Sequence, residues 1–270
     1  MGYDWKYYLE DLEARQRGRA KGRDVAQAIG FRMSAIERKQ ARNFVKNLLL
    51  NYRKQDSTQN AAITDLVKVH GEYCLQQPES SAAKMRHNTM VYRYMLETAL
   101  HNRAVAVKMG VSKSAVWKNI TQAVEEMTIL CFGLPAVPGM PETWKEGVKS
   151  LIRNYPLLKR AVRCSRPLEC KAWQQEREKC LKITGKAISG FERVIHMYEE
   201  FAEGIRFPDE QRRPLEELKA RYLDKQMAIA DVASLFQVSE KCVYADIKKM
   251  QERFAKMFEI TEGKWQEDLK

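Results

Sequence analysis

The sequence predicts an all-α protein with two tandem helical modules, each ending in a helix-turn-helix, and three observations favour this fold. Long stretches rich in Leu, Ala, Met, Lys, Glu and Arg place apolar residues three and four positions apart, the period of an amphipathic helix. Residues 133–141 hold three prolines and two glycines, which interrupt the helical pattern near the middle of the chain. Two similar stretches, beginning at Ala104 and Asp231, have the spacing of a helix-turn-helix.

Length and charge narrow the class of protein. A chain of 270 residues suits two modules rather than one small domain. The formal net charge of +12 is larger than solubility requires and favours a polyanionic partner such as nucleic acid. The sequence has no run of 18 apolar residues, and its start lacks the basic-then-apolar order of a signal peptide. We therefore expect a soluble, cytoplasmic protein.

The cysteines do not predict a structural metal site. Six cysteines occur without the two-to-four-residue spacing that zinc ligands usually have. Cys164, Cys170 and Cys180 together with His196 form a loose group that leaves a metal site open as an alternative. Ordinary thiols in a reducing compartment are the preferred interpretation, so we expect neither a metal nor a cofactor.

The breaks in the helical pattern predict five segments. These are a basic N-terminal arm (1–34), a first helical module (35–134) with a helix-turn-helix at 101–127, a linker (135–143), a middle helical region (144–206) and a second module (207–270) with a helix-turn-helix at 227–256.

Shorter matches extend the similarity of the two halves. The run Val-Lys-Asn-Leu-Leu-Leu-Asn-Tyr at 45–52 recurs as Val-Lys-Ser-Leu-Ile-Arg-Asn-Tyr at 148–155. Arg-Tyr-Met at 93–95 recurs as Arg-Tyr-Leu at 221–223, and roughly 25 extra residues separate these landmarks in the second half. The pattern favours an internal duplication, and the alternative is a chance match between Leu- and Lys-rich helices.

Each helix-turn-helix is called a hairpin below. In the first hairpin we expect a supporting helix at 101–109 and a recognition helix from Ser112 to about Met127. Ala106 is small where the helices cross, and Gly110 can take a left-handed conformation at the end of the first helix. Ser112 can cap the second helix. The residues expected inside are Val111, Val116, Ile120 and Val124, and those expected to face outward are Ser112, Lys113, Ser114, Trp117, Lys118 and Thr121. Trp117, a less expected residue on such a face, is also a candidate DNA-binding residue: covering the neighbouring helix is the preferred interpretation, and packing against a sugar or a thymine methyl group of DNA is the alternative.

The second hairpin repeats the plan with Gln237 in place of the turn glycine, at an expected cost of about 1 kcal/mol. Its expected inward residues are Ile229, Val232, Ala233, Phe236, Val238, Val243, Ile247, Met250 and Phe254. Its expected outward residues are Ser239, Glu240, Lys241, Tyr244, Ala245 and Lys248. Because the outward residues differ between the copies, either the two hairpins read different DNA sequences or one of them is mainly structural.

The N-terminal arm offers a further contact with DNA. Arg15, Arg17, Arg19, Lys21 and Arg23 lie close together among residues with little apolar content. We expect them to order along DNA phosphates, and the alternative is a solvated charged surface.

The stretch 229–247 resembles region four of bacterial sigma factors and the related phage late-gene regulators of the ArpU and RinA types. The first hairpin, followed by Glu-Glu-Met-Thr-Ile-Leu-Cys-Phe-Gly at 125–133, is similar to the ends of those regulators. The match covers about 45 residues in each half. The resemblance implies binding to promoter DNA, RNA polymerase as a possible partner, and DNA contacts at Lys113, Lys118, Lys241 and Lys248.

These observations lead to the hypothesis of a phage- or mobile-element-encoded transcription regulator that binds double-stranded DNA and is not an enzyme. Linking two DNA-reading units in one chain raises the local concentration of the second once the first is bound. A non-catalytic adaptor or inhibitor, acting in DNA packaging or blocking a host nucleoprotein complex, is the alternative because residues 157–204 exceed the simple regulator plan. A recombinase or transposase component is a third class, but no histidine has an arginine three positions later, as tyrosine recombinases require.

Overall fold

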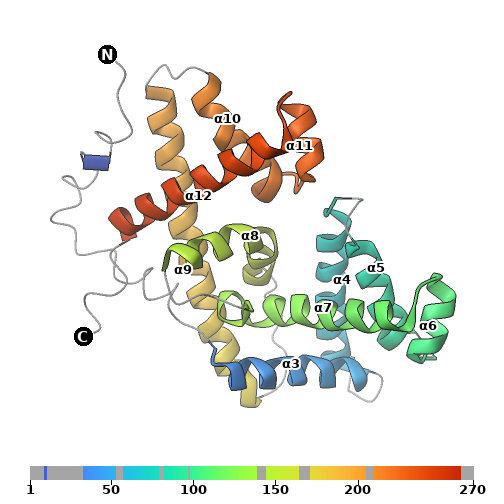
Figure 1. Ribbon diagram of the computed structural model, residues 1–270. Coiled ribbons are helices and arrows are strands. Elements are labelled where there is room, and N and C mark those ends of the chain that lie inside the picture. Colours follow the sequence, from blue (N-terminus) through green and yellow to red (C-terminus); the bar gives the residue numbers. More distant parts are fainter. Residues whose placement is uncertain are drawn as a thin grey trace. The chain divides into compact units, whose positions relative to one another are not determined.

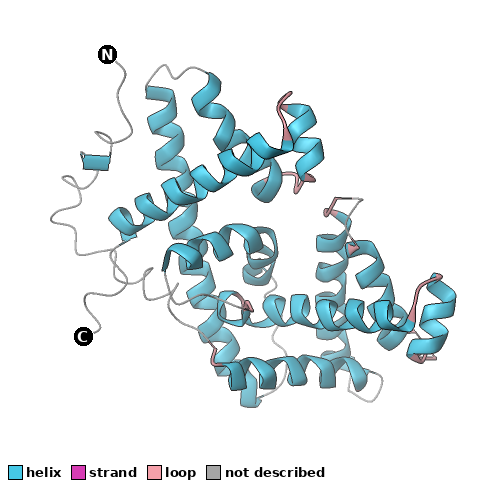
Figure 2. Ribbon diagram, viewed as in Figure 1, coloured by secondary structure: helices cyan, strands magenta, loops and turns pink. Residues whose placement is uncertain are grey.

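The computed structural model describes residues 9–10, 33–52, 57–78, 82–96, 98–138, 144–163, 171–204 and 209–262. The predicted all-α fold is confirmed, since the described segments form helices joined by short connections and contain no strand (Figures 1 and 2). The basic residues of the N-terminal arm, Arg15, Arg17, Arg19, Lys21 and Arg23, lie outside the described residues. Of the helices described, none is both long and apolar enough to cross a bilayer.

The chain divides into two compact units. The N-terminal unit contains Met33–Ala136 and Leu157–Leu181, and the C-terminal unit is formed mainly by the described residues of Val137–Pro156 and Lys182–Lys270. Residues 144–206, which the sequence set apart as a middle region, contribute to both units.

The same order of elements occurs twice along the chain. The first series is α3 (Ala35–Leu50), α4 (Ser57–Leu75), α5 (Ala83–Met90), the π-helical turn η3 (Val91–Met95), α6 (Asn102–Met109) and α7 (Lys113–Phe132). The second series is α8 (Trp144–Arg163), α9 (Lys171–Gly204), α10 (Asp209–Leu218), the π-helical turn η5 (Lys219–Leu223), α11 (Ile229–Leu235) and α12 (Glu240–Glu262). The 3-10 turn η4 (Leu134–Ala136) follows the first series.

The Asn-Tyr landmark makes equivalent contacts in the two series. The Asn51 side-chain amide donates to the Asn47 carbonyl at 3.0 Å, and that of Asn154 donates to the Ser150 carbonyl at 2.8 Å. The tyrosine that follows bonds to a residue 12 positions later in the first series, where Tyr52 meets Thr64. In the second series, Tyr155 donates to Glu192, 37 positions later. The extra residues of the second half therefore fall between Tyr155 and Glu192.

The Arg-Tyr landmark lies on the π-helical turn of each series. Arg93 Nη1 donates to the Leu100 carbonyl at 3.4 Å, and Arg221 Nη1 donates to the Met227 carbonyl at 2.6 Å. Each guanidinium also lies over the ring of the following tyrosine, 5.3 Å from the Tyr94 centroid and 5.2 Å from that of Tyr222. In both series this arginine ties the π-helical turn to the backbone that leads into the hairpin.

Each unit has its own aromatic core. In the N-terminal unit, α7 packs on α3, α4, α5 and α6, and its second half is buried on nearly every side. The Phe132 ring lies edge-on to Phe44 and Trp173, with centroids 6.2 and 5.4 Å away. In the C-terminal unit, the Phe254 ring lies edge-on to Phe191 and Tyr198, at 5.6 and 5.7 Å. These cores hold the long helix of each hairpin in place.

Candidate nucleic-acid interface

The first hairpin consists of α6, a tight turn and α7. Gly110 ends α6 in a left-handed conformation with φ of 64°, as the sequence predicted. The Val111 N–H then donates to the Ala106 carbonyl at 3.0 Å, a bond from the residue after the left-handed one that is typical of a helix end. Ser112 caps α7 by accepting a hydrogen bond from the Ala115 N–H at 3.1 Å. The predicted turn and cap are both confirmed.

The second hairpin, α11 to α12, repeats these bonds. Gln237 has φ of 55°, so the left-handed conformation is kept without a glycine. The Val238 N–H donates to the Ala233 carbonyl at 3.0 Å, and Ser239 accepts from the Cys242 N–H at 3.2 Å. An L-residue in this conformation costs roughly 1–2 kcal/mol, which the surrounding contacts offset.

The predicted inward residues are buried along the long helices but not all at the turns. Those that are buried are Ala106, Val116, Ile120, Val124, Val232, Ala233, Val243, Ile247, Met250 and Phe254. The expectation was wrong for Val111, Ile229, Phe236 and Val238, which are only half-buried because they lie at the turns or at the first residue of α11. The recognition helix also runs to Phe132 rather than to about Met127, since burial continues to its end.

The outward residues of both hairpins lie at the surface. Exposed positions are Ser112, Lys113, Ser114, Trp117, Lys118, Ser239, Glu240, Lys241, Tyr244, Ala245 and Lys248, while Thr121 is half-buried. Trp117 is 64% exposed, so the expectation that it covers the neighbouring helix was wrong. Trp117 follows the buried Val116 and is therefore rotated by about 100° from it around the helix axis. The matching Tyr244 is 60% exposed.

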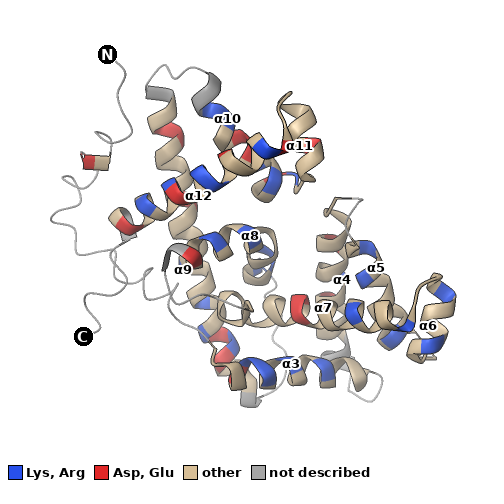
Figure 3. Cartoon of the chain, viewed as in Figure 1, with Lys and Arg blue, Asp and Glu red and all other residues tan. Residues whose placement is uncertain are grey.

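The two hairpins differ in charge. Residues 101–124 contain Arg103, Lys108, Lys113 and Lys118 and no acidic residue, a net charge of +4. The matching residues 228–251 contain Lys241, Lys248 and Lys249 against Asp231, Glu240 and Asp246, a net charge of zero. Figure 3 shows blue along α6 and the start of α7, but both colours on α12. The first hairpin is therefore the better match for a polyanion.

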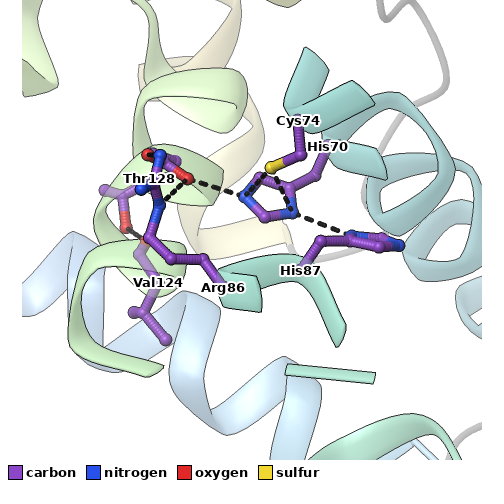
Figure 4. A network of polar contacts seen from close by, with 7 residues as sticks. His70, Cys74, Arg86, His87, Val124 and Thr128 are labelled. Atoms are coloured by element: carbon purple, nitrogen blue, oxygen red, sulfur yellow. Dashed lines mark hydrogen bonds and ion pairs between the residues drawn. The ribbon is translucent and has the colours of Figure 1, made fainter. Parts of the chain in front are cut away.

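A buried polar network that no sequence pattern indicated joins α4 and α5 to the second half of α7, the long helix of the first hairpin (Figure 4). His70 Nε2 lies 2.9 Å from Glu126 Oε2, and Arg86 Nη2 donates to Glu126 Oε1 at 2.7 Å. On its other side, His70 Nδ1 lies 3.2 Å from His87 Nδ1. Burial is the main cause that lowers the pKa of His87 to about 4, and the neighbouring His70 is the second cause. The ring of a neutral His87 can thus form one hydrogen bond with His70, with a single proton between the two Nδ1 atoms.

The same cluster does not have the geometry of a metal centre. One ligand atom each of His70, Cys74 and Glu126 lies within 4.8 Å of the others. However, Cys74 Sγ is 3.6 Å from one His70 ring nitrogen and 4.0 Å from the other, so it lies across the ring rather than in line with either lone pair. Arg86 already holds the Glu126 carboxylate, and burial raises the pKa of the Cys74 thiol to about 12. These contacts fit a structural ion pair better than a bound cation.

The loose cysteine group of the sequence analysis is not assembled in the described part of the chain. Cys180 is buried beside Glu176, whereas the His196 side chain is 71% exposed and paired with Glu200 at 3.3 Å. Cys164 and Cys170 lie outside the described residues.

The C-terminal unit has a different polar contact at the matching place. Tyr198 on α9 and Arg253 on α12 follow His70 and Glu126 by 128 and 127 positions, and Arg253 Nη1 donates to the Tyr198 hydroxyl at 2.6 Å. Nearby, Arg213 on α10 bonds to Asp246 at 2.9 Å and lies 3.2 Å from Glu217. Burial and, next, the Asp246 charge raise the pKa of Glu217 to about 7. The two halves thus share backbone geometry but not buried chemistry.

Comparison of this chain with protein-family models, curated proteins and solved structures found no match. The resemblance to sigma region four and to the ArpU and RinA regulators therefore stays a prediction from the hairpin residues alone.

Proposed function

We propose that this chain binds double-stranded DNA through the outward face of α7 and acts as a transcription regulator without catalytic activity. The observation that carries the proposal is the first hairpin itself. Its long helix presents Lys113, Trp117 and Lys118 at the surface, and no acidic residue lies between 101 and 124. A helix that is exposed and cationic at its N-terminal end suits the major groove of B-DNA.

The repeated series of elements supports an origin by internal duplication of one helix-turn-helix module. Equivalent hydrogen bonds occur at the Asn-Tyr landmark, at the Arg-Tyr landmark and at both hairpin turns. The left-handed residue that ends the first helix of each hairpin, Gly110 and Gln237, agrees with a common origin of the two modules. After duplication the copies diverged in charge, and the first hairpin is proposed as the main DNA contact.

An adaptor role is the second candidate, and the neutral second hairpin favours it. The outward residues of α12 include Glu240, Lys241 and the exposed ring of Tyr244, and Leu235 at the end of α11 is exposed as well. Such a surface suits a protein partner, for example RNA polymerase or another nucleoprotein complex, better than a row of phosphates. A chain that binds DNA through the first hairpin and a protein through the second is compatible with both the regulator and the adaptor role.

Selection of duplexes from a random-sequence pool by the full chain tests the proposal. A regulator enriches a defined site, whereas an adaptor enriches DNA poorly. Binding to the enriched duplex is then measured across a series of salt concentrations for the native chain and two double variants.

Lys113→Ala with Lys118→Ala is expected to reduce the slope of log affinity against log salt by about two, because each lost phosphate contact removes about 0.9. The matched control, Lys241→Ala with Lys248→Ala, is expected to change this slope much less. Absence of duplex binding by the native chain, or equal slopes for the first variant and the native chain, would contradict the proposal. Cleavage of labelled duplex in the presence of a divalent cation would contradict the non-catalytic role.

A further inference from the structure

The outward face of α7 has one large apolar group and few free polar ones. Trp117 lies in the second turn of the helix and is 64% exposed, although an indole is among the largest surfaces that folding can bury. Lys113 and Lys118 on either side of it in sequence are also exposed. Folding of the N-terminal unit therefore does not use this ring.

The hydroxyl groups of the same face are already engaged within the helix. Ser112 accepts from the Ala115 N–H, and its oxygen lies 2.9 Å from that of Ser114. The Thr121 hydroxyl donates to the Trp117 carbonyl at 3.0 Å. Each of these hydroxyls thus already makes a hydrogen bond within α7 or its cap, whereas the two lysines and Trp117 are the large exposed side chains of residues 112–121.

These three groups differ in what they can recognise in a major groove. A lysine ammonium binds phosphates or the O6 and N7 acceptors of guanine. An indole ring offers apolar surface, and the one apolar group that a standard base presents at the floor of the major groove is the C5-methyl of thymine. The ring lies close to the N-terminal end of α7, the part of such a helix that approaches base edges.

We infer that Trp117 is a specificity-determining residue that packs on a thymine methyl group in the major groove. This inference rests on the proposed binding of duplex DNA by the first hairpin. The matching Tyr244 is exposed to a similar extent, but Glu240 and Asp246 lie on the same helix, so the second hairpin supplies a natural control.

The test uses the duplex enriched by the full chain and the same duplex with deoxyuridine in place of thymine. Deoxyuridine keeps the base pair and its hydrogen-bonding groups and removes only the methyl. Burial of one methyl is worth about 0.8 kcal/mol, so the native chain is expected to bind the deoxyuridine duplex about fourfold more weakly for each methyl contacted. Trp117→Ala is expected to bind both duplexes equally, and Tyr244→Ala is expected to keep the native preference.

The native chain alone can overturn the inference. Sequence-selective binding with equal affinity for the thymine and deoxyuridine duplexes would refute the methyl contact while leaving DNA binding intact. A Trp117→Ala variant that keeps the preference would also refute it, provided that far-ultraviolet circular dichroism shows native helicity. Absence of any duplex binding by the native chain would refute both this inference and the proposed function.

Discussion

Replacing Gln237 by glycine is expected to stabilise the C-terminal unit. Gln237 has φ of 55°, a conformation that costs an L-residue roughly 1–2 kcal/mol. Glycine avoids this cost but gives the unfolded chain more freedom, which removes about 0.4–1 kcal/mol of the gain. The glutamine side chain is exposed, so no packing is lost. The net gain in the free energy of unfolding is expected to be about 0.5–1 kcal/mol.

Gly110 provides the matched reverse change. Its φ is 64°, and a Cβ atom built there meets no heavy atom within 4 Å. Gly110→Gln is therefore expected to lower the free energy of unfolding by the conformational cost alone, about as much as Gln237→Gly raises it. The chain with both changes is expected to unfold near the native midpoint.

Urea unfolding followed by circular dichroism measures these differences, with thermal melting as an independent check. The reasoning would be refuted if Gln237→Gly lowered the free energy of unfolding, or if Gly110→Gln left it unchanged. Either result would mean that the left-handed residue is not a source of strain in these turns.

Three further predictions concern the caps and the buried charges. Ser112→Ala and Ser239→Ala each remove one cap hydrogen bond, and each is expected to lower the free energy of unfolding in urea by about 1 kcal/mol. An unchanged free energy of unfolding would contradict a stabilising role of the caps. The pKa of Glu217 is raised to about 7 from its ordinary 4.5, so the folded state binds this proton more tightly than the unfolded state does. The contribution of Glu217 to the free energy of unfolding is therefore fully present below pH 4.5 and is lost as the pH rises through 7. Glu217→Gln is therefore expected to be more stable than the native chain above about pH 8, by no more than about 3 kcal/mol, and identical pH profiles would contradict this assignment. Arg86→Met leaves the buried Glu126 carboxylate without the Arg86 guanidinium and is expected to lower the free energy of unfolding by roughly 3–5 kcal/mol. Adding Glu126→Gln is expected to recover much of this loss. A double variant as unstable as Arg86→Met alone would contradict the ion pair.

Features set by a few neighbouring residues were predictable from the sequence. The left-handed Gly110 and the Ser112 cap follow from local backbone chemistry, and the helices follow from the spacing of apolar residues. The similarity of the two halves could also be seen in the sequence, because identities such as Arg-Tyr occur where the arginine side chain bonds to a nearby carbonyl.

Features that depend on distant partners were not predictable. His70 meets Glu126 across 56 residues, and nothing in the local pattern around either residue indicates that pairing. The exposure of Trp117 depends on which neighbour packs against α7, whereas periodicity gives only the direction of a side chain relative to its own helix. The length of α7 was underestimated because the packing of its second half sustains it past Met127.

The difference in buried polar contacts between the two series bears on how a chain with two similar halves avoids misassembly. Similar halves are prone to pair helices from the wrong copy while the chain is folding. If α4 packed against α12, His70 would face the half-buried Arg253, and an imidazole would stand in place of the Tyr198 hydroxyl that the arginine bonds to in the native arrangement. The crossed pairing loses the native hydrogen bond between arginine and hydroxyl, so it is expected to be less stable than the pairing of each series with its own helices.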